Sequence, residues 1–257
     1  METYFNINYE FDQEMVDEII FNKIENRRPG YVCSLDGTNL AIAHTKPDHL
    51  RILNEAIVNN CDSIWVPVFV NMIYGTKFKN YYGMDMFIKY ISMKKFRQFF
   101  LGSTPEILQK LKEKLSNDDP DIKEMRFETL PFKAAEDFDY DQIGRMINED
   151  RPDIIWVSLG APKQEKFMSL LLPYLNQGVM FGFGAIFNMH AEIPELKRAP
   201  RYLIKLKLEW LYRVFQEPGK QIRRVSLILK ILPKILRDEL RKKALKRKYQ
   251  RRNFSVI

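Results

Sequence analysis

Short apolar segments alternate with stretches of helical spacing from residue 31 to residue 183, and this alternation constrains the fold more than any other feature. Residues 31–35, 62–69 and 153–158 are typical of buried strands. Further strands are predicted at 96–101, 125–127 and 179–183. Strands separated by helices of about ten residues favour a parallel sheet that is covered by helices on both faces.

Helical spacing fills the intervals between these strands. At 104–115, apolar residues at 107, 108, 111 and 115 share one face of a helix. The other helices are predicted at 40–60 with a break near Pro47, and at 85–92, 141–149 and 162–172. We expect one α/β domain over residues 1–197, followed by a helical appendage over residues 198–257.

The appendage is strongly basic. Residues 198–257 contain 19 Lys and Arg residues against four Asp and Glu residues, whereas residues 1–197 contain 22 against 29. This concentration of positive charge predicts an anionic partner, either nucleic acid or an anionic membrane surface. No signature of a nucleic-acid-binding fold accompanies the charge, so we expect the membrane rather than nucleic acid.

Residues 221–252 combine this charge with a periodic apolar pattern. Apolar side chains recur on one face of a helix, at 222, 225, 228, 229, 232, 235, 236 and 240. This pattern is typical of a helix that lies in a membrane interface. A helix packed on the protein's own core or on a partner subunit would show the same spacing, and that alternative stays open. The membrane hypothesis predicts that a chain ending after Arg224 keeps its α/β body folded but binds vesicles more weakly.

Targeting and metal signals are absent from the sequence. It shows neither a signal peptide nor an uncharged apolar run of about 18 residues, so we expect a cytoplasmic protein that is peripheral on the inner face of the cell membrane. Cys33 and Cys61 lie in apolar contexts, which predicts two reduced, buried thiols. The three histidines have no metal-binding spacing, and the Asp-x-Asp triplets fall in acidic stretches that we interpret as solvated surface. We therefore expect no metal site and no cofactor.

Ligands of a parallel α/β sheet bind beyond the carboxyl ends of its strands, so the residues after each strand are the candidates for a site. Asp36, Thr38 and Asn39 follow the first strand, where they would either cap a helix or face a ligand. Gly102 and Ser103 open a helix whose free N–H groups would attract phosphate. An ordinary strand-to-helix turn is the alternative for both segments.

Two later segments follow predicted strands, and the first of them has a combination of residues that is rarer than an ordinary turn requires. Residues 158–165 read Ser-Leu-Gly-Ala-Pro-Lys-Gln-Glu, and residues 182–187 read Gly-Phe-Gly-Ala-Ile-Phe. Their glycines allow the backbone to approach a ligand closely, and Phe187 would be able to stack on a base. Downstream, Arg-Ala-Pro at 198–200 and Glu-Trp-Leu-Tyr-Arg at 209–213 precede the basic tail.

These four motifs, in this order, resemble the WecG/TagA/CpsF glycosyltransferases, most clearly over residues 153–224. The resemblance implies a Rossmann-like parallel sheet flanked by helices and an arginine-rich appendage that completes the active site and meets the membrane. It implies inverting transfer of a sugar from a UDP-sugar to a polyprenyl-diphosphate-linked acceptor, in the assembly of wall, capsular or exopolysaccharides. It also implies that no metal motif is needed and that the UDP-sugar is a co-substrate rather than a cofactor.

The resemblance also implies residue roles by position in the matching motifs. Nucleotide-sugar binding is expected of Gly102, Ser103, Gly160, Pro162, Gln164, Glu165, Gly182, Gly184 and Phe187. The acceptor side and the appendage are expected to use Thr38, Asn39, Arg198, Glu209 and Trp210. Arg213, Arg223 and Arg224 are the candidates to bind the diphosphate, because a guanidinium binds phosphate through two N–H groups.

One family feature is missing from its predicted place. Members carry an Asp-Gly after the second strand, whose Asp is the proposed base, and the predicted strand at 62–69 ends without a carboxylate. Asp85 and Asp36 are therefore the candidate bases. The alternative function is a catalytically degenerate relative that binds a nucleotide-sugar or scaffolds a glycan-assembly complex. Donor sugar, acceptor and homo-oligomer formation are left open.

Overall fold

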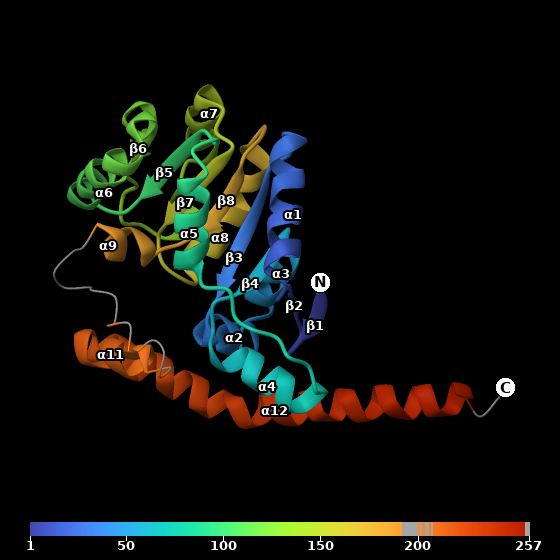
Figure 1. The fold of residues 1–257 in the computed structure, drawn as a ribbon. Helices are drawn as coiled ribbons and strands as arrows, with labels where there is room; N and C mark the ends of the chain where they lie inside the picture. The colour runs from blue at the N-terminus through green and yellow to red at the C-terminus, as the bar shows by residue number, and fades with distance from the viewer. Residues whose placement is uncertain (192–199, 201, 204–205, 207, 255–257) are drawn as a thin grey trace.

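The computed structural model describes residues 1–191, 200, 202–203, 206 and 208–254. Six parallel strands form the central sheet of the described chain, with helices on both faces (Figure 1). The order across the sheet is β4 (Val58–Cys61), β3 (Gly30–Leu35), β8 (Val179–Gly182), β7 (Ile154–Ser158), β5 (Gln98–Gly102) and β6 (Arg126–Glu128). The predicted α/β fold with a Rossmann-like parallel sheet is confirmed.

Each face of the sheet has its own hydrophobic core, because successive strand residues point to opposite faces. Val32 belongs to one core and Cys33 to the other. One core is covered by α1 (Gln13–Glu25), α5 (Gly83–Ser92), α6 (Pro105–Asp118) and α9 (Ile186–His190). The other is covered by α2 (Gly37–Ala43), α3 (Pro47–Glu55), α4 (Trp65–Tyr74), α7 (Tyr140–Asp150) and α8 (Lys163–Leu171). Burial on both faces explains why the central strands read as continuous apolar runs.

The strand predicted at 62–69 is wrong. β4 lies earlier, at Val58–Cys61, and the apolar run from Trp65 onward forms the helix α4. A short apolar run has no periodicity that separates a buried strand from a buried helix. Ser63 lies just before the start of this helix, and its Oγ accepts hydrogen bonds from the backbone N–H groups of Trp65 and Val66 at 3.3 and 3.4 Å. The helix predicted at 40–60, with its break near Pro47, corresponds to α2 and α3, but α3 ends at Glu55 and residues 58–60 belong to β4.

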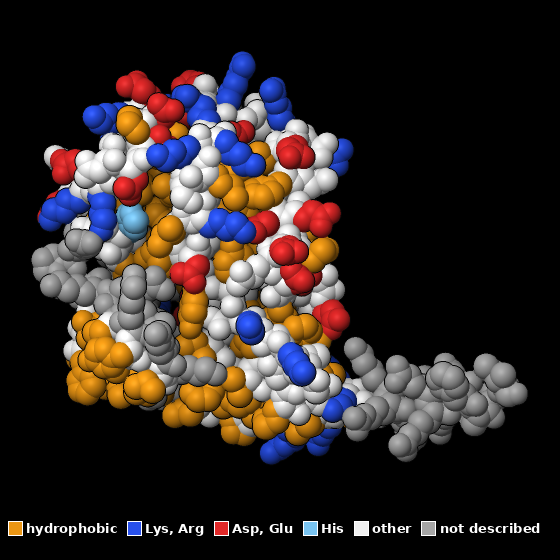
Figure 2. All heavy atoms as spheres, in the orientation of Figure 1, with side chains coloured by type: hydrophobic (Ala, Val, Ile, Leu, Met, Phe, Trp, Pro, Cys, Tyr) orange, Lys and Arg blue, Asp and Glu red, His pale blue; other side chains and the backbone are white. Residues whose placement is uncertain are grey.

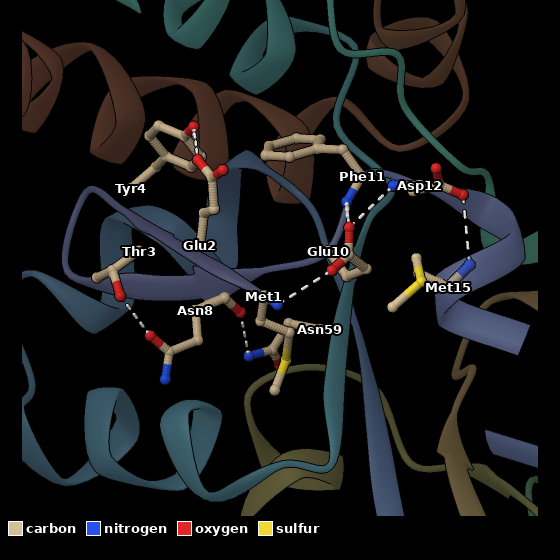
Figure 3. Close-up of polar contacts among 10 residues, drawn as sticks. All are labelled: Met1, Glu2, Thr3, Tyr4, Asn8, Glu10, Phe11, Asp12, Met15 and Asn59. Atoms are coloured by element: carbon tan, nitrogen blue, oxygen red, sulfur yellow. Dashed lines mark hydrogen bonds and ion pairs between the residues drawn. The ribbon is translucent and has the colours of Figure 1, made fainter. Parts of the chain in front are cut away.

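An N-terminal hairpin, which the sequence did not predict, covers the edge strand β4. β1 (Glu2–Tyr4) and β2 (Ile7–Tyr9) pair antiparallel around a turn at Phe5 and Asn6. The side-chain amide of Asn59 donates to the backbone oxygen of Asn8 at 2.8 Å (Figure 3). The N–H of Glu10 donates to the oxygen of Asn59 at 3.0 Å. The hairpin thereby satisfies part of an edge that would otherwise be open to pairing.

The C-terminal segment forms α11 (Glu209–Gln216) and the long helix α12 (Pro218–Phe254). α12 crosses the body against α2 and α4 (Figure 1). Ile235 enters the core, which confirms packing on the protein's own core for one face of the helix. Ile222, Leu229 and Leu240 remain exposed on the other face. Within the described residues, no helix combines the length and the apolar character that crossing a bilayer requires.

Candidate active site at the carboxyl ends of the strands

Gln164 joins the turns that follow the two central strands β7 and β8. Its side chain, buried at the start of α8, accepts hydrogen bonds from the N–H groups of Gly160 and Gly184 at 3.1 and 3.0 Å. Its amide group also donates to the oxygen of Gly182 at 2.8 Å. One side chain therefore satisfies polar groups from both turns, and segments 158–165 and 182–187 are brought together as predicted.

The backbones of these turns approach so closely that side chains would not fit between them. A Cβ on Gly184 would lie 2.6 Å from the Cα of Gly160, and a Cβ on Gly102 would lie 2.6 Å from the oxygen of Ser158. Ser103 has a φ of 67°, which is unusual for a residue with a side chain. Its N–H donates to Ser158 at 3.1 Å. The turns after β5, β7 and β8 thus pack closely against one another at the carboxyl edge of the sheet.

Glu165 lies fully buried beneath this surface. Its carboxylate accepts a hydrogen bond from Gln164 at 3.0 Å, while its Oε2 has no hydrogen-bond partner of ordinary geometry among the described residues. Burial raises the pKa of the Glu165 carboxyl to about 7, and the nearby carboxylate of Asp36 adds to the rise, whereas Gln164 and Asn39 oppose it. The predicted nucleotide-binding role of Glu165 would therefore be indirect, through the side chain of Gln164.

Asp36, Thr38 and Asn39 begin α2 at the end of β3. The Asp36 carboxylate accepts hydrogen bonds from the N–H groups of Thr38 and Asn39, each at 2.9 Å, so the helix-capping alternative describes its present role. Asn39 is buried, and its Oδ1 lies 3.0 Å from Nε2 of His49. Burial lowers the pKa of His49 to about 4, so the neutral ring donates to Asn39 at neutral pH.

The corrected position of β4 supplies the carboxylate that the sequence analysis did not find. Asp62 follows Cys61 directly, and the register of the sheet pairs Cys61 with Leu35. Asp62 and Asp36 therefore end neighbouring strands. The carboxylate of Asp62 accepts a hydrogen bond from the N–H of Gly83 at 2.8 Å. The signal that would have revealed it is the short β-branched segment before Cys61, which we had assigned to a helix.

Of two further predicted site residues, Phe187 lies differently from the expectation. Phe187 is fully buried, with its ring among those of Phe87 and Phe100. Its predicted stacking on a base is wrong, because α9 turns this ring into the core. Asp85 is exposed in the first turn of α5, two residues after the backbone group that binds Asp62.

The appendage reaches the same edge of the sheet. Cδ1 of Ile228 lies 3.1 Å from where a Cβ on Gly37 would be, so α12 packs directly beside Asp36. Arg224 precedes Ile228 by about one helical turn and is half-buried, and Arg223 is exposed. Figure 1 shows α11, which contains Glu209, Trp210 and Arg213, on this side of the molecule. Arg198 lies outside the described residues.

Two further expectations concern the cysteines and metal binding. Cys33 and Cys61 are free and buried, as predicted. Among the residues that the structure describes, no group of three or more His, Cys, Asp and Glu side chains is placed to hold a metal ion.

Comparison with known proteins gives a consistent set of similarities. Residues 5–245 match the family described as Glycosyl transferase WecG/TagA/CpsF family. The chain is 27% identical over 222 residues to the N-acetylglucosaminyldiphosphoundecaprenol N-acetyl-beta-D-mannosaminyltransferase of Bacillus subtilis (strain 168), covering 85% of this chain and 84% of the relative. The protein of the same name from Bacillus spizizenii is 28% identical over 201 residues, covering 77% and 75% of the two chains.

Proposed function

Because the chain belongs to the WecG/TagA/CpsF glycosyltransferase family, we propose that it moves a sugar from a UDP-sugar, with inversion, to a polyprenyl-diphosphate-linked acceptor in the assembly of a bacterial surface polysaccharide. The supporting observation is the joining of the turns after β7 and β8 by Gln164, with Asp62 at the same edge of the sheet. By the names of the relatives, N-acetylmannosamine and a lipid-linked N-acetylglucosaminyl diphosphate are the first donor sugar and acceptor to test.

The diphosphate of the donor would lie against the turns at 102–103 and 158–164. N–H groups at helix starts favour negative charge, and these turns allow close approach. We assign Arg223 and Arg224 of α12, together with Arg213 of α11, to the charge that grows on UDP as its bond to the sugar breaks. With cationic side chains in this role, transfer would proceed without a metal ion.

Asp62 is our candidate for the base. Inversion requires the acceptor hydroxyl to lose its proton as its oxygen attacks the anomeric carbon, opposite to the departing UDP. The hydrogen bond from Gly83 fixes the orientation of the Asp62 carboxylate. Asp36 would support the site by holding the start of α2, where Thr38 and Asn39 would lie beside the acceptor.

The acceptor's lipid would remain in the membrane, so the enzyme has to work at the bilayer surface. We propose that the exposed basic residues of α12 bind anionic lipid on the inner face of the cell membrane. Each Lys or Arg near such a surface contributes about 1 kcal/mol.

The test is UDP release from UDP-N-acetylmannosamine, with and without the lipid-linked acceptor. We expect release that depends on the acceptor and that persists in EDTA. Asp62→Asn keeps an oxygen for the Gly83 N–H, so it should fold and bind UDP but lose about 10²- to 10⁴-fold in kcat. Asp36→Asn and Asp85→Asn, measured in parallel, should lose much less. Tight UDP binding without turnover on any acceptor would support the degenerate alternative instead.

A further inference from the structure

The helix that follows Asp62 is almost entirely apolar, with Asn71 and Tyr74 as its polar side chains. α4 contains no charged residue between Trp65 and Tyr74. One side of the helix packs into the core through Val66, Val70 and Ile73. The adjoining side leaves Trp65 50% exposed and Met72 69% exposed. Helices of this kind occur inside a core or in contact with lipid, and Trp65 and Met72 are not in the core.

This exposed side continues onto the appendage. α12 packs alongside α4, and its Ile222, Leu229 and Leu240 are exposed. Figure 2 shows hydrophobic side chains gathered along the side of the molecule where α4, α11 and α12 lie in Figure 1. A contiguous apolar surface of this kind marks an interaction site, whereas single exposed apolar residues do not.

Basic side chains border the apolar surface. Lys77 and Lys79 are exposed just after α4, and α12 exposes Lys230, Lys234, Arg237 and Arg241. The ammonium group of Lys243 also hydrogen-bonds the backbone oxygen of Ile73, which ties the end of α4 to α12. An apolar centre with a cationic border complements an anionic bilayer, whose acyl chains lie beneath a layer of phosphates. Nucleic acid would leave the apolar centre exposed.

We propose that α4 is a membrane-docking helix whose exposed side chains, Trp65 and Met72, enter the interface of an anionic bilayer next to α12. The membrane contact of α4 does not depend on the proposed function; only its consequence for the position of Asp62 relative to the acceptor rests on that function. Trp65 lies three residues after Asp62, so insertion of α4 would hold that carboxylate at the depth of the lipid headgroups. The diphosphate of a lipid-linked acceptor lies at the same depth. The α/β body would thus contact the membrane through its own helix as well as through the basic tail.

The experiment compares two double variants of the full chain. One carries Trp65→Glu and Met72→Glu, and the control carries Met15→Glu and Ile88→Glu, which alter residues 44% and 45% exposed on α1 and α5. Both are first checked for native circular dichroism and Tm. Sedimentation with phosphatidylglycerol–phosphatidylcholine vesicles should then show at least about a tenfold weaker affinity for the α4 variant, because two apolar side chains that would insert into the bilayer are replaced by carboxylates. The control should bind like the wild type.

A second readout separates this inference from the proposed function. With a short-chain, water-soluble acceptor the α4 variant should turn over like the control, but with acceptor in vesicles it should be slower. If no acceptor is used by any variant, the proposed function fails while vesicle sedimentation still decides the role of α4. Equal vesicle binding by the two variants would overturn the inference. So would a loss of self-association with vesicle binding unchanged, since the face would then cover a second copy of the chain.

Discussion

At the scale of single residues, Gln164 and Glu165 are neighbours in the sequence but have different structural roles. Gln164 satisfies the backbone of two turns, and its orientation depends on the buried carboxyl beneath it. The sequence motif indicated that both matter, but it did not reveal that Glu165 lies fully buried. Burial of an ionisable group makes its pKa differ between the folded and the unfolded chain, so the free energy of unfolding depends on pH.

Glu165→Gln should change how stability depends on pH. Burial raises the pKa of Glu165 from 4.5 to about 7, so the folded chain holds this proton more tightly than the unfolded chain. The resulting contribution to the free energy of unfolding is fully present below pH 4.5 and is lost as pH rises to about 7. The stability of the wild type relative to the variant should therefore fall across this window, by up to about 1.4 kcal/mol per pH unit.

Urea unfolding at a series of pH values measures this difference. His49 titrates with the opposite sign, because its lowered pKa costs stability as pH falls from 6.5 to about 4. It is present in both proteins and cancels in the comparison. Glu25→Gln, at an exposed position of α1, is the matched control. A difference that stays constant between pH 4.5 and 7 would show that Glu165 is not held protonated by burial.

Gly184→Ala should separate the two turns that Gln164 joins. The new Cβ would lie 2.6 Å from backbone atoms of Gly160, so one turn has to shift. We expect a loss of about 1–3 kcal/mol in the free energy of unfolding, and weaker binding of UDP in calorimetry. Gly219→Ala, where a Cβ meets nothing within 4 Å, is the control. Unchanged UDP affinity in Gly184→Ala would argue against these turns as the nucleotide site.

At the scale of elements, α12 is fastened to the body by a buried acid. Glu239 accepts hydrogen bonds from the N–H of Phe5 at 3.0 Å and from the hydroxyl of Tyr74 at 2.8 Å. Ile235, one turn earlier, lies in the core. Truncating the chain before this part of α12 would therefore expose core residues. We therefore revise the expectation for a chain ending after Arg224, which should unfold more easily as well as bind vesicles more weakly.

Glu239→Ala isolates this attachment. The N–H of Phe5 and the hydroxyl of Tyr74 would lose their acceptor, which costs about 1–3 kcal/mol. A lowered Tm is the expected result. Arg237→Ala, at an exposed position two residues away, should change stability by no more than about 0.5 kcal/mol. Equal Tm values for the two variants would mean that Glu239 does not hold the helix.

At the scale of the whole molecule, the parallel sheet was predictable and the placement of the appendage was not. β5, β7 and β8 are buried on both faces, so their apolar runs could be recognised as strands in the sequence. The run from Trp65 is equally apolar, and its assignment as a strand hid Asp62. In α12 the same helical spacing serves both the core and the exposed side, so periodicity alone does not separate docking on the body from docking on a membrane.

The most direct test of the whole account is a crystal structure of the protein with UDP-N-acetylmannosamine bound. Our account predicts that the diphosphate lies against the turns at 102–103 and 158–164, with arginines of α11 or α12 beside it. The anomeric carbon should face Asp62. A donor found instead in the surface hollow between α6 and β6, lined by Leu108, Lys112 and Arg126, would contradict it.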